Sequence, residues 1–232
     1  MISALSLGLS PPVSTHQRRH AFERVYAEGR WIAGADGAGC KSGWSDVASG
    51  QGSAALRALE SVVGRYGVAS LTDVPCGDFC FGGAALSHLR ASTPGLAYEG
   101  IDVVPSLVDA HAALHSNNRT RFVSLDVASL ARLPRPTDLV FSRQMTQHLC
   151  NADVAAFLSA VNRSDAKLAL LTTFDVGPGF ENTDIGCASG GYRAQSLTAP
   201  PFSLPPPLRF FSEEYPTDPR VGLGLWKIPF FA

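Results

Sequence analysis

The stretch S-L-T-D-V-P-C-G-D-F-C-F-G-G, from Ser70 to Gly83, decides how the rest of the chain is interpreted. Its apolar start predicts a short strand, P-C-G-D predicts a tight loop, and the residues from Phe81 onward predict a helix. A strand, loop and helix in this order bind nucleotides in open α/β sheets. That interpretation depends on whether acidic residues also follow the next strands along the chain.

The composition favours a small-molecule partner. The 232 residues suit one α/β domain with additions, large enough to bury a core without disulfides or a structural metal. With 19 Lys and Arg against 20 Asp and Glu, the chain has no general attraction to nucleic acid or to an anionic membrane. We therefore expect a small-molecule substrate, no nucleic-acid partner and no membrane partner.

The cysteines indicate a reducing compartment. Five of them form an odd number in a chain too large to depend on disulfides, so we expect a cytoplasmic protein. Cys76 and Cys80 are expected to be buried packing residues, because no second pair stands at zinc spacing, and we expect no metal site. The N-terminal M-I-S-A-L-S-L-G-L-S-P-P lacks a basic leader and a cleavage site, which argues against a signal peptide.

Hydrophobic periodicity predicts the remaining elements. Helices are expected over 16–28, over 53–66 with Ser53 as the cap, over 81–90, from Pro105 onward, and over 152–161 with Asn151 as the cap. Further strands are expected over 97–101, 121–125, 138–142, 167–173, 208–212 and 223–228.

Strand and helix alternate through most of the chain, which indicates parallel pairing with right-handed crossovers. The predicted fold is therefore α/β: a mostly parallel, doubly wound, seven-stranded sheet with helices on both faces and a C-terminal antiparallel hairpin. Residues 1–52 are expected to supply an N-terminal helix and a loop that covers the cofactor or the substrate. Residues 53–232 are expected to form the cofactor-binding part of the same structural domain.

Acidic residues do follow the next two strands. Asp102 comes after the second strand and Asp126 after the third. A carboxylate after the second strand can accept both ribose hydroxyls, and one after the third can accept the exocyclic amine of adenine. Together with Gly77 in the first loop, they indicate an adenosine-containing cofactor. The alternative is that both acids only cap the loops they open.

This order and spacing resemble the class I, Rossmann-like methyltransferases that depend on S-adenosyl-L-methionine (SAM). In that family the first loop is typically D-x-G-x-G-x-G, the second strand ends in the ribose-binding acid, and an antiparallel hairpin closes the sheet. Asp73, Gly77, Asp102 and Asp126 occupy the corresponding places, and G-L-G-L-W-K-I resembles the final strand. The similarity covers residues 53–228 in outline and is closest to a small group with D-x-P-C-G-D in the first loop.

The resemblance implies SAM as the cofactor and a methyl transfer to oxygen or nitrogen of a small polar acceptor, with transfer to sulfur left open. It also implies a set of cofactor-binding residues in the first loop and at the ends of the next three strands. These are Asp73, Pro75, Cys76, Gly77, Asp78, Phe79, Asp102, Val103, Asp126, Val127, Arg143 and Gln144.

The first loop also departs from the family pattern. Pro75 and Phe79 replace the first and third glycines, so the backbone is less suited to the close approach of a pyrophosphate. Asp78, at a helix N-terminus, would repel a pyrophosphate but can pair with the ammonium of a methionine moiety, unless it only caps the helix. These departures favour SAM over NAD. An NAD(P)-dependent oxidoreductase and a catalytically inactive SAM-binding or scaffold protein remain the alternatives.

His148 is the candidate catalytic residue. It follows the fourth strand in S-R-Q-M-T-Q-H-L, where methyl acceptors commonly lie in proteins resembling this family, and an imidazole can remove a proton from an attacking group. A histidine that only anchors its loop is the alternative. The loop over 175–207 is too long for an ordinary connection and predicts a substrate-binding segment. The candidate substrate-binding residues are Trp31, Asp175, Tyr192 and Arg193.

Overall fold

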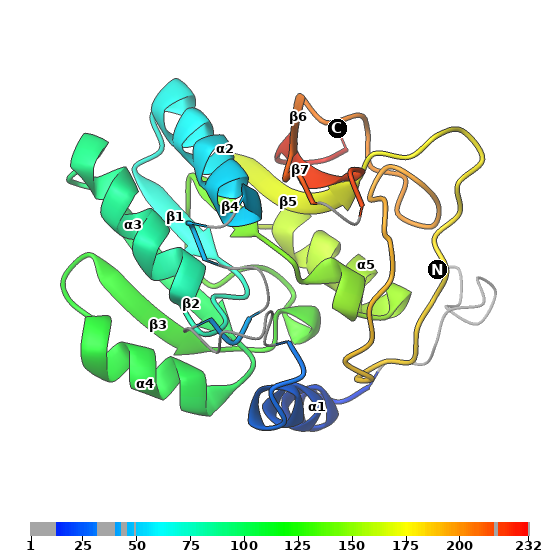
Figure 1. Ribbon diagram of the computed structural model, residues 1–232, viewed down its shortest axis with the longest axis horizontal. Coiled ribbons are helices and arrows are strands. Elements are labelled where there is room, and N and C mark those ends of the chain that lie inside the picture. The colour runs from blue at the N-terminus through cyan, green and yellow to red at the C-terminus, as the bar shows by residue number, and fades with distance from the viewer. Residues whose placement is uncertain (1–12, 32–39, 43–45, 49, 216–217, 232) are drawn as a thin grey trace.

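A computed structural model describes residues 13–31, 40–42, 46–48, 50–215 and 218–231. Its centre is a seven-stranded sheet in the order β3-β2-β1-β4-β5-β7-β6 (Figure 1). The strands are β1 (Ser70–Asp73), β2 (Ala97–Asp102), β3 (Thr120–Ser124), β4 (Leu139–Ser142), β5 (Leu168–Phe174), β6 (Arg209–Ser212) and β7 (Val221–Lys227). Strands β1 to β5 pair in parallel, and β7 runs antiparallel to both β5 and β6. The predicted fold class is confirmed.

The helices lie close to their predicted positions. They are α1 (Thr15–Ala27), α2 (Gly50–Tyr66), α3 (Cys80–Ser92), α4 (Pro105–His115) and α5 (Asn151–Asn162), with short 3-10 helices η2 (Val127–Ser129) and η3 (Thr146–His148). Two predicted caps are wrong. Ser53 lies inside α2, where its hydroxyl accepts a hydrogen bond from Arg57, and the N-cap position of α5 holds Cys150, without a side-chain capping hydrogen bond, rather than Asn151.

Both faces of the sheet are covered, because alternate residues of each strand point to opposite sides. Leu139 and Phe141 of β4 belong to a core with apolar residues of α2 and α3. Val140, between them, belongs to a second core with α5 and with Leu197 of the long loop after β5. The two cores on either side of the sheet fix the strand ends around which the site forms.

The sheet reverses its direction of growth at β1, which lies between β2 and β4. In an open α/β sheet, ligands bind beyond the carboxyl ends of the strands at this position. The stretch Ser70–Gly83 lies at this position, because its loop connects the carboxyl end of β1 to the start of α3.

Two segments outside the sheet approach this position. In Figure 1, α1 (blue) lies at the bottom of the view, and the loop after β5 (yellow to orange) runs down the right side towards it. The two segments touch: a Cβ added at Gly190 of the loop would come within 2.9 Å of Val25 Cγ2 in α1. Within the described part of the chain, none of the helices has the length and apolar character that a membrane crossing requires.

Candidate active site

A cavity of about 500 Å³ opens at the carboxyl ends of β1, β2 and β4 and beside the segment that follows β3. Its volume lies in the range typical of small-molecule sites. Most of the residues predicted from the sequence line it. They are Trp31, Asp73, Pro75, Cys76, Gly77, Asp78, Asp102, Val103, Asp126, Val127, Arg143, Gln144, His148 and Tyr192.

Phe79 does not line the cavity, which counts against the predicted cofactor contact of its side chain. The residue has a φ of 58°, in the left-handed region, and its ring packs against Tyr98 and Phe122 in the core. The ring fits there because Gly82 and Gly83 lie in the first turn of α3: a Cβ at Gly82 would come within 2.8 Å of it. Phe79 therefore fixes the shape of the first loop from behind.

The backbone amides of the first loop all have acceptors. The Gly77 N–H donates to Asp102 Oδ2 at 3.0 Å, and the Asp78 N–H donates to Ser42 Oγ at 3.1 Å. Neighbouring amides are also occupied, with Cys76 donating to Ile101 O, Phe79 to Cys76 O and Cys80 to Asp78 Oδ1. A phosphate-binding loop needs free N–H groups that point at the ligand. From Cys76 to Cys80, the loop offers none.

Asp102, at the end of β2, is buried against the first loop. One carboxylate oxygen accepts the Gly77 N–H, and the other accepts the Val104 N–H at 2.9 Å. Burial raises the pKa of Asp102 to about 6, although these two hydrogen bonds lower it. A carboxylate has about four acceptor positions, so each oxygen keeps capacity for a further donor such as a ribose hydroxyl.

Asp73 is the second buried carboxyl group of the cavity wall. Its Oδ2 accepts the Tyr98 hydroxyl at 2.6 Å, and burial raises the pKa of Asp73 to about 7. A cation bound beside it would favour the ionised form and lower that pKa. Asp73 is therefore a suitable partner for an ammonium group in the cavity.

Asp78 lines the cavity but is already engaged with the N-terminal segment. Its Oδ2 accepts the backbone N–H groups of Lys41 and Ser42, and its Oδ1 accepts the Cys80 N–H. The structure therefore uses Asp78 to hold residues 40–42 against the first loop. This arrangement makes Asp73 a better partner for an ammonium than Asp78.

Asp126 is also engaged. It accepts hydrogen bonds from the Thr15 hydroxyl at 2.7 Å, from Arg18 Nε at 2.9 Å and from the Ser129 hydroxyl at 2.8 Å, besides the Ala128 N–H. Burial alone would raise the pKa of Asp126, but these hydrogen bonds outweigh it and lower the pKa. The carboxylate has no capacity left for the adenine amine that the sequence assigned to it. Its role is to hold α1.

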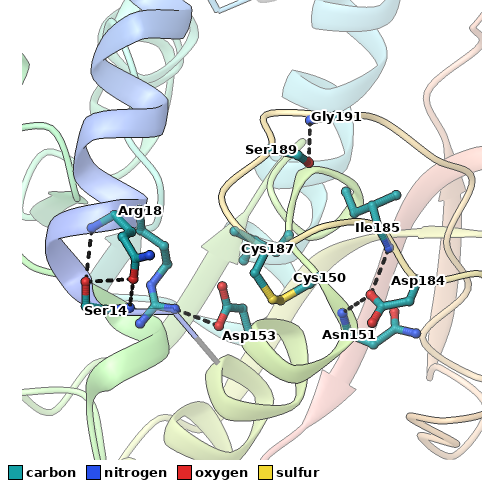
Figure 2. Close-up of a disulfide and its surroundings, with 12 residues drawn as sticks. Ser14, Arg18, Cys150, Asn151, Asp153, Asp184, Ile185, Cys187, Ser189 and Gly191 are labelled. Carbon is teal, nitrogen blue, oxygen red and sulfur yellow. Dashed lines mark hydrogen bonds and ion pairs between the residues drawn. A yellow bond between two sulfur atoms is a disulfide. The ribbon is translucent and has the colours of Figure 1, made fainter. Parts of the chain in front are cut away.

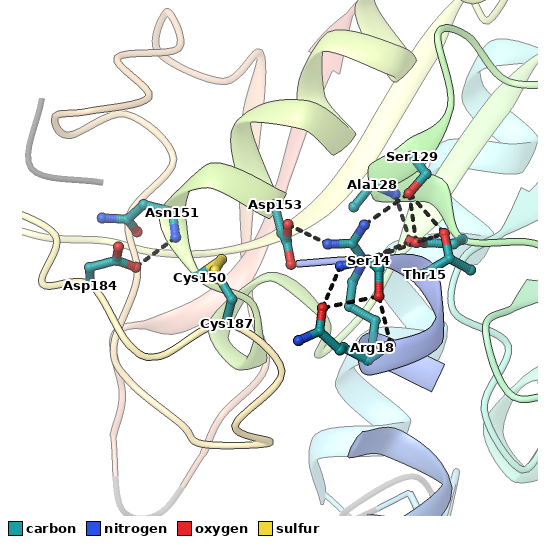
Figure 3. Close-up of polar contacts among 12 residues, drawn as sticks. Ser14, Thr15, Arg18, Ala128, Ser129, Cys150, Asn151, Asp153, Asp184 and Cys187 are labelled. Atoms are coloured by element: carbon teal, nitrogen blue, oxygen red, sulfur yellow. Dashed lines mark hydrogen bonds and ion pairs between the residues drawn. A yellow bond between two sulfur atoms is a disulfide. The ribbon is translucent and has the colours of Figure 1, made fainter. Parts of the chain in front are cut away.

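Arg18 is one of the site residues that the sequence did not single out. Its side chain is 5% exposed and bridges two acids, since Nε contacts Asp126 and Nη1 contacts Asp153 of α5 at 2.7 Å. Figure 2 shows Arg18 turned towards Asp153, and Figure 3 shows the same group beside Thr15 and Ser129. The one signal in the sequence is that Arg18 precedes Phe22 and Val25 by four and seven residues, on the buried face of the predicted helix.

Beyond β4, the cavity wall is held by a buried ion pair. Arg143 Nε contacts Glu213 Oε1 at 2.5 Å, and Glu213, which the sequence did not single out, is fully buried. Glu213 also accepts the Gln144 side-chain amide at 3.2 Å. Gln144 has a φ of 56°, which a residue other than glycine rarely adopts, and such positions cluster at functional sites.

His148 lies in η3, after β4, where it contacts the long loop that follows β5. Its Nδ1 is 2.7 Å from the carbonyl oxygen of Gly191, so Nδ1 carries the proton and Nε2 keeps its lone pair. Burial lowers the pKa of His148 to about 4, which leaves the imidazole neutral at physiological pH. The ring centroids of Trp31 and Tyr192 lie 4.6 and 5.6 Å from that of His148.

Two predicted substrate-binding residues lie outside the cavity wall. Arg193 is buried, and its guanidinium donates to the Leu149 carbonyl and to Asn151 Oδ1. It therefore holds the long loop against the start of α5, which counts against the predicted substrate contact. Asp175 is exposed just after β5, and its backbone N–H donates to the Arg220 carbonyl.

Four of the five cysteines are paired, so the expectation of free packing thiols is wrong for Cys80. Cys40 and Cys80 form one disulfide, and Cys150 and Cys187 form another, with Cα atoms 5.5 and 4.8 Å apart. Cys76 is free and buried, as predicted. Disulfides persist in oxidising compartments and are rare in the cytosol. Their presence counts against the predicted cytoplasmic location, which stays a prediction.

The second disulfide fastens the long loop next to His148. It lies at the start of α5, with Asp153 on one side and Asp184 on the other (Figure 2). Ligand atoms of Cys150, Asp153 and Cys187 come within 4.8 Å of one another. Because the two sulfur atoms are bonded to each other, this group is a covalent crosslink rather than a metal-ligand set.

The sequence matches no protein-family model and no curated protein. Solved structures match through the fold. The 1,6-didemethyltoxoflavin-N1-methyltransferase of Burkholderia thailandensis, with S-adenosylhomocysteine bound, is 16% identical at a TM-score of 0.57, over 94% of this chain and 92% of that one. The chain has the fold of the SAM-dependent methyltransferases.

Two further methyltransferases support this fold. The methyltransferase domain of bacterial CtHen1 is 16% identical at a TM-score of 0.55, over 77% of this chain and 100% of that domain. The magnesium protoporphyrin IX methyltransferase of Synechocystis PCC 6803, with SAM bound, is 11% identical at a TM-score of 0.55, over 93% of this chain and 97% of that one. With this methyltransferase fold, the cavity occupies the crevice that the sheet order predicts for a ligand.

We predict that the double substitution Cys150→Ser with Cys187→Ser lowers the free energy of unfolding by about 3–4 kcal/mol, because the unfolded chain regains the entropy of the released loop. Urea denaturation without reductant measures the effect. With reductant present, both proteins lack the crosslink and the difference should vanish. A difference that persists under reduction would contradict this explanation.

Proposed function

We propose that the protein transfers a methyl group from SAM to an oxygen or nitrogen atom of a small acceptor. The observation that carries this proposal is the placement of Asp102. It is a buried carboxylate at the end of β2, hydrogen-bonded to the first loop and facing a cavity at the point where the sheet order reverses. A carboxylate at this position accepts the hydroxyls of a ribose.

Two further features support a sulfonium amino acid rather than a dinucleotide. The amides of the first loop are occupied from Cys76 to Cys80, which removes the usual site for a pyrophosphate. Asp73, buried in the same wall, suits the ammonium of the methionine moiety. Both features count against an NAD(P)-dependent oxidoreductase.

Adenine would lie beside the segment that follows β3. Leu125, Val127 and Ala128 line that part of the cavity and supply apolar surface for the flat base. Because Asp126 is engaged with α1, recognition of the base would rest on this packing and not on the Asp126 carboxylate. Val103, also in the wall, would continue the surface towards the ribose.

Methyl transfer makes modest demands on the protein. The sulfonium is already activated, so most of the rate enhancement comes from holding the nucleophile in line with the methyl group and excluding water. A base is needed only when the nucleophile carries a proton. His148 would accept that proton at Nε2, since its Nδ1–H is fixed by the Gly191 carbonyl.

The proposed function predicts that Asp102→Ala weakens the binding of S-adenosylhomocysteine by at least about 100-fold, because two hydrogen bonds to a charged group are lost. Isothermal calorimetry measures the affinity, and a thermal melt checks that the variant is folded. Asp175→Ala is the matched control, since Asp175 is exposed and lies outside the cavity wall. Unchanged affinity in Asp102→Ala would contradict the assignment.

His148→Asn should lower methyl transfer about 100-fold while leaving the affinity for S-adenosylhomocysteine unchanged. Transfer of labelled methyl groups from SAM to a small-molecule extract measures the rate. Because the pKa of His148 is lowered to about 4, the proton-accepting form is complete above that pH. The wild-type rate at saturating SAM should therefore show no loss near the ordinary histidine pKa. An inflection near that pKa that disappears in His148→Asn would contradict the neutral-base role.

A further inference from the structure

We propose that the acceptor is an uncharged, flat aromatic compound with a hydroxyl group, bound among Trp31, His148 and Tyr192. This inference rests on the proposed function and narrows its substrate class. It is carried by five aromatic side chains of the cavity wall, which we call the acceptor end: Phe22, Tyr26, Trp31, His148 and Tyr192.

A continuous series of rings forms this end of the cavity. The Trp31 ring lies 5.9 Å from that of Phe22 and 5.7 Å from that of Tyr26, the latter at an angle of 79°. On its other side, Trp31 approaches His148, which in turn approaches Tyr192. The rings come from α1, from the turn after it, from η3 and from the long loop, so several separate segments converge on one aromatic wall.

These rings are available to a ligand, unlike those of the core. Phe22, Tyr26, Trp31 and His148 are only partly buried, and Tyr192 is 57% exposed, while all five line the cavity. The other large ring cluster, around Phe79, contains Tyr98 and Phe122, which are buried and lie outside the cavity wall. Partly exposed rings in a cavity wall offer stacking and edge contacts to another aromatic ring.

The charges of the cavity favour an uncharged acceptor. Three arginines line it among the described residues, and each is paired with a carboxylate. Arg18 pairs with Asp126 and Asp153, Arg30 with Glu28, and Arg143 with Glu213. A carboxylate or phosphate on the acceptor would have to compete with the two buried pairs, those of Arg18 and Arg143, while the Arg30–Glu28 pair is exposed. The acceptor end therefore matches an aromatic compound whose only strongly polar group is the one that reacts.

His148 supplies the proton acceptor that a reacting hydroxyl needs. With Nδ1–H donated to Gly191, Nε2 can accept a hydrogen bond from an O–H group. In the reaction, an oxygen lone pair forms the new bond to the methyl carbon, and the carbon–sulfur bond breaks with its electron pair returning to sulfur. The products are a methyl ether and neutral S-adenosylhomocysteine. The hydroxyl proton passes to Nε2 of His148 and then to solvent.

The test measures binding to the protein loaded with S-adenosylhomocysteine, using calorimetry with naphthol, its saturated counterpart decahydronaphthol, naphthalene and naphthoic acid. Binding of S-adenosylhomocysteine is measured first, so that a failure of the proposed function is seen separately. We expect naphthol to bind about tenfold more tightly than the saturated alcohol, because only a flat ring gains the aromatic contacts. Naphthalene and naphthoic acid should both bind more weakly than naphthol.

Tyr192→Leu should weaken naphthol binding about three- to tenfold without changing the affinity for S-adenosylhomocysteine. Tyr66→Leu is the matched control, since Tyr66 is 41% exposed at the end of α2 and lies outside the cavity wall. The comparison of naphthol with its saturated counterpart uses only the wild-type protein and does not depend on how the variants fold. Equal binding of these two alcohols, or tighter binding of naphthoic acid, would overturn the inference. If the wild-type protein does not bind S-adenosylhomocysteine, the proposed function itself is overturned.

Discussion

The buried guanidinium of Arg18 holds the site together. It lies between Asp126, after β3, and Asp153, in α5, and so joins α1 to two parts of the domain that are distant in sequence. Removing one partner of a buried ion pair typically costs about 3–5 kcal/mol, because the other charge stays buried without compensation. Here the loss of Arg18 would leave two acids uncompensated. The position of α1, and with it the shape of the cavity, depends on this contact.

The consequences of that contact reach the acceptor end of the cavity. α1 carries Phe22 and Tyr26, and the turn after it carries Trp31, which contacts the His148 ring. The Cys150–Cys187 disulfide secures the opposite side by fixing the loop that supplies Gly191 and Tyr192. The carboxylates thus divide into two groups. Asp126 and Asp78 hold the covering segments, while Asp73 and Asp102 are left for a ligand.

The sequence predicted the sheet, the reversal at β1 and about half of the residues that line the cavity. Those features follow from local patterns: apolar strands of period two, the loop after Asp73, and an acid at the end of the strand Ala97–Asp102. It did not predict which acids are engaged. Arg18 and Asp126 are 108 residues apart, and no local pattern links them. Asp78 and Phe79 were likewise assigned by position in the loop, whereas their partners come from residues 40–42 and from the core. The disulfides were missed because the odd number of cysteines and the length of the chain argued against them.

We propose that Asp102 and Asp73 bind the cofactor while Asp126 stays with Arg18. A crystal structure with S-adenosylhomocysteine bound tests it most directly. We expect the ribose hydroxyls within hydrogen-bond distance of Asp102, the amino group beside Asp73, and the Arg18–Asp126 contact unchanged. An adenine amine bonded to an Asp126 released from Arg18, or a ligand bound away from Asp102, would contradict the account.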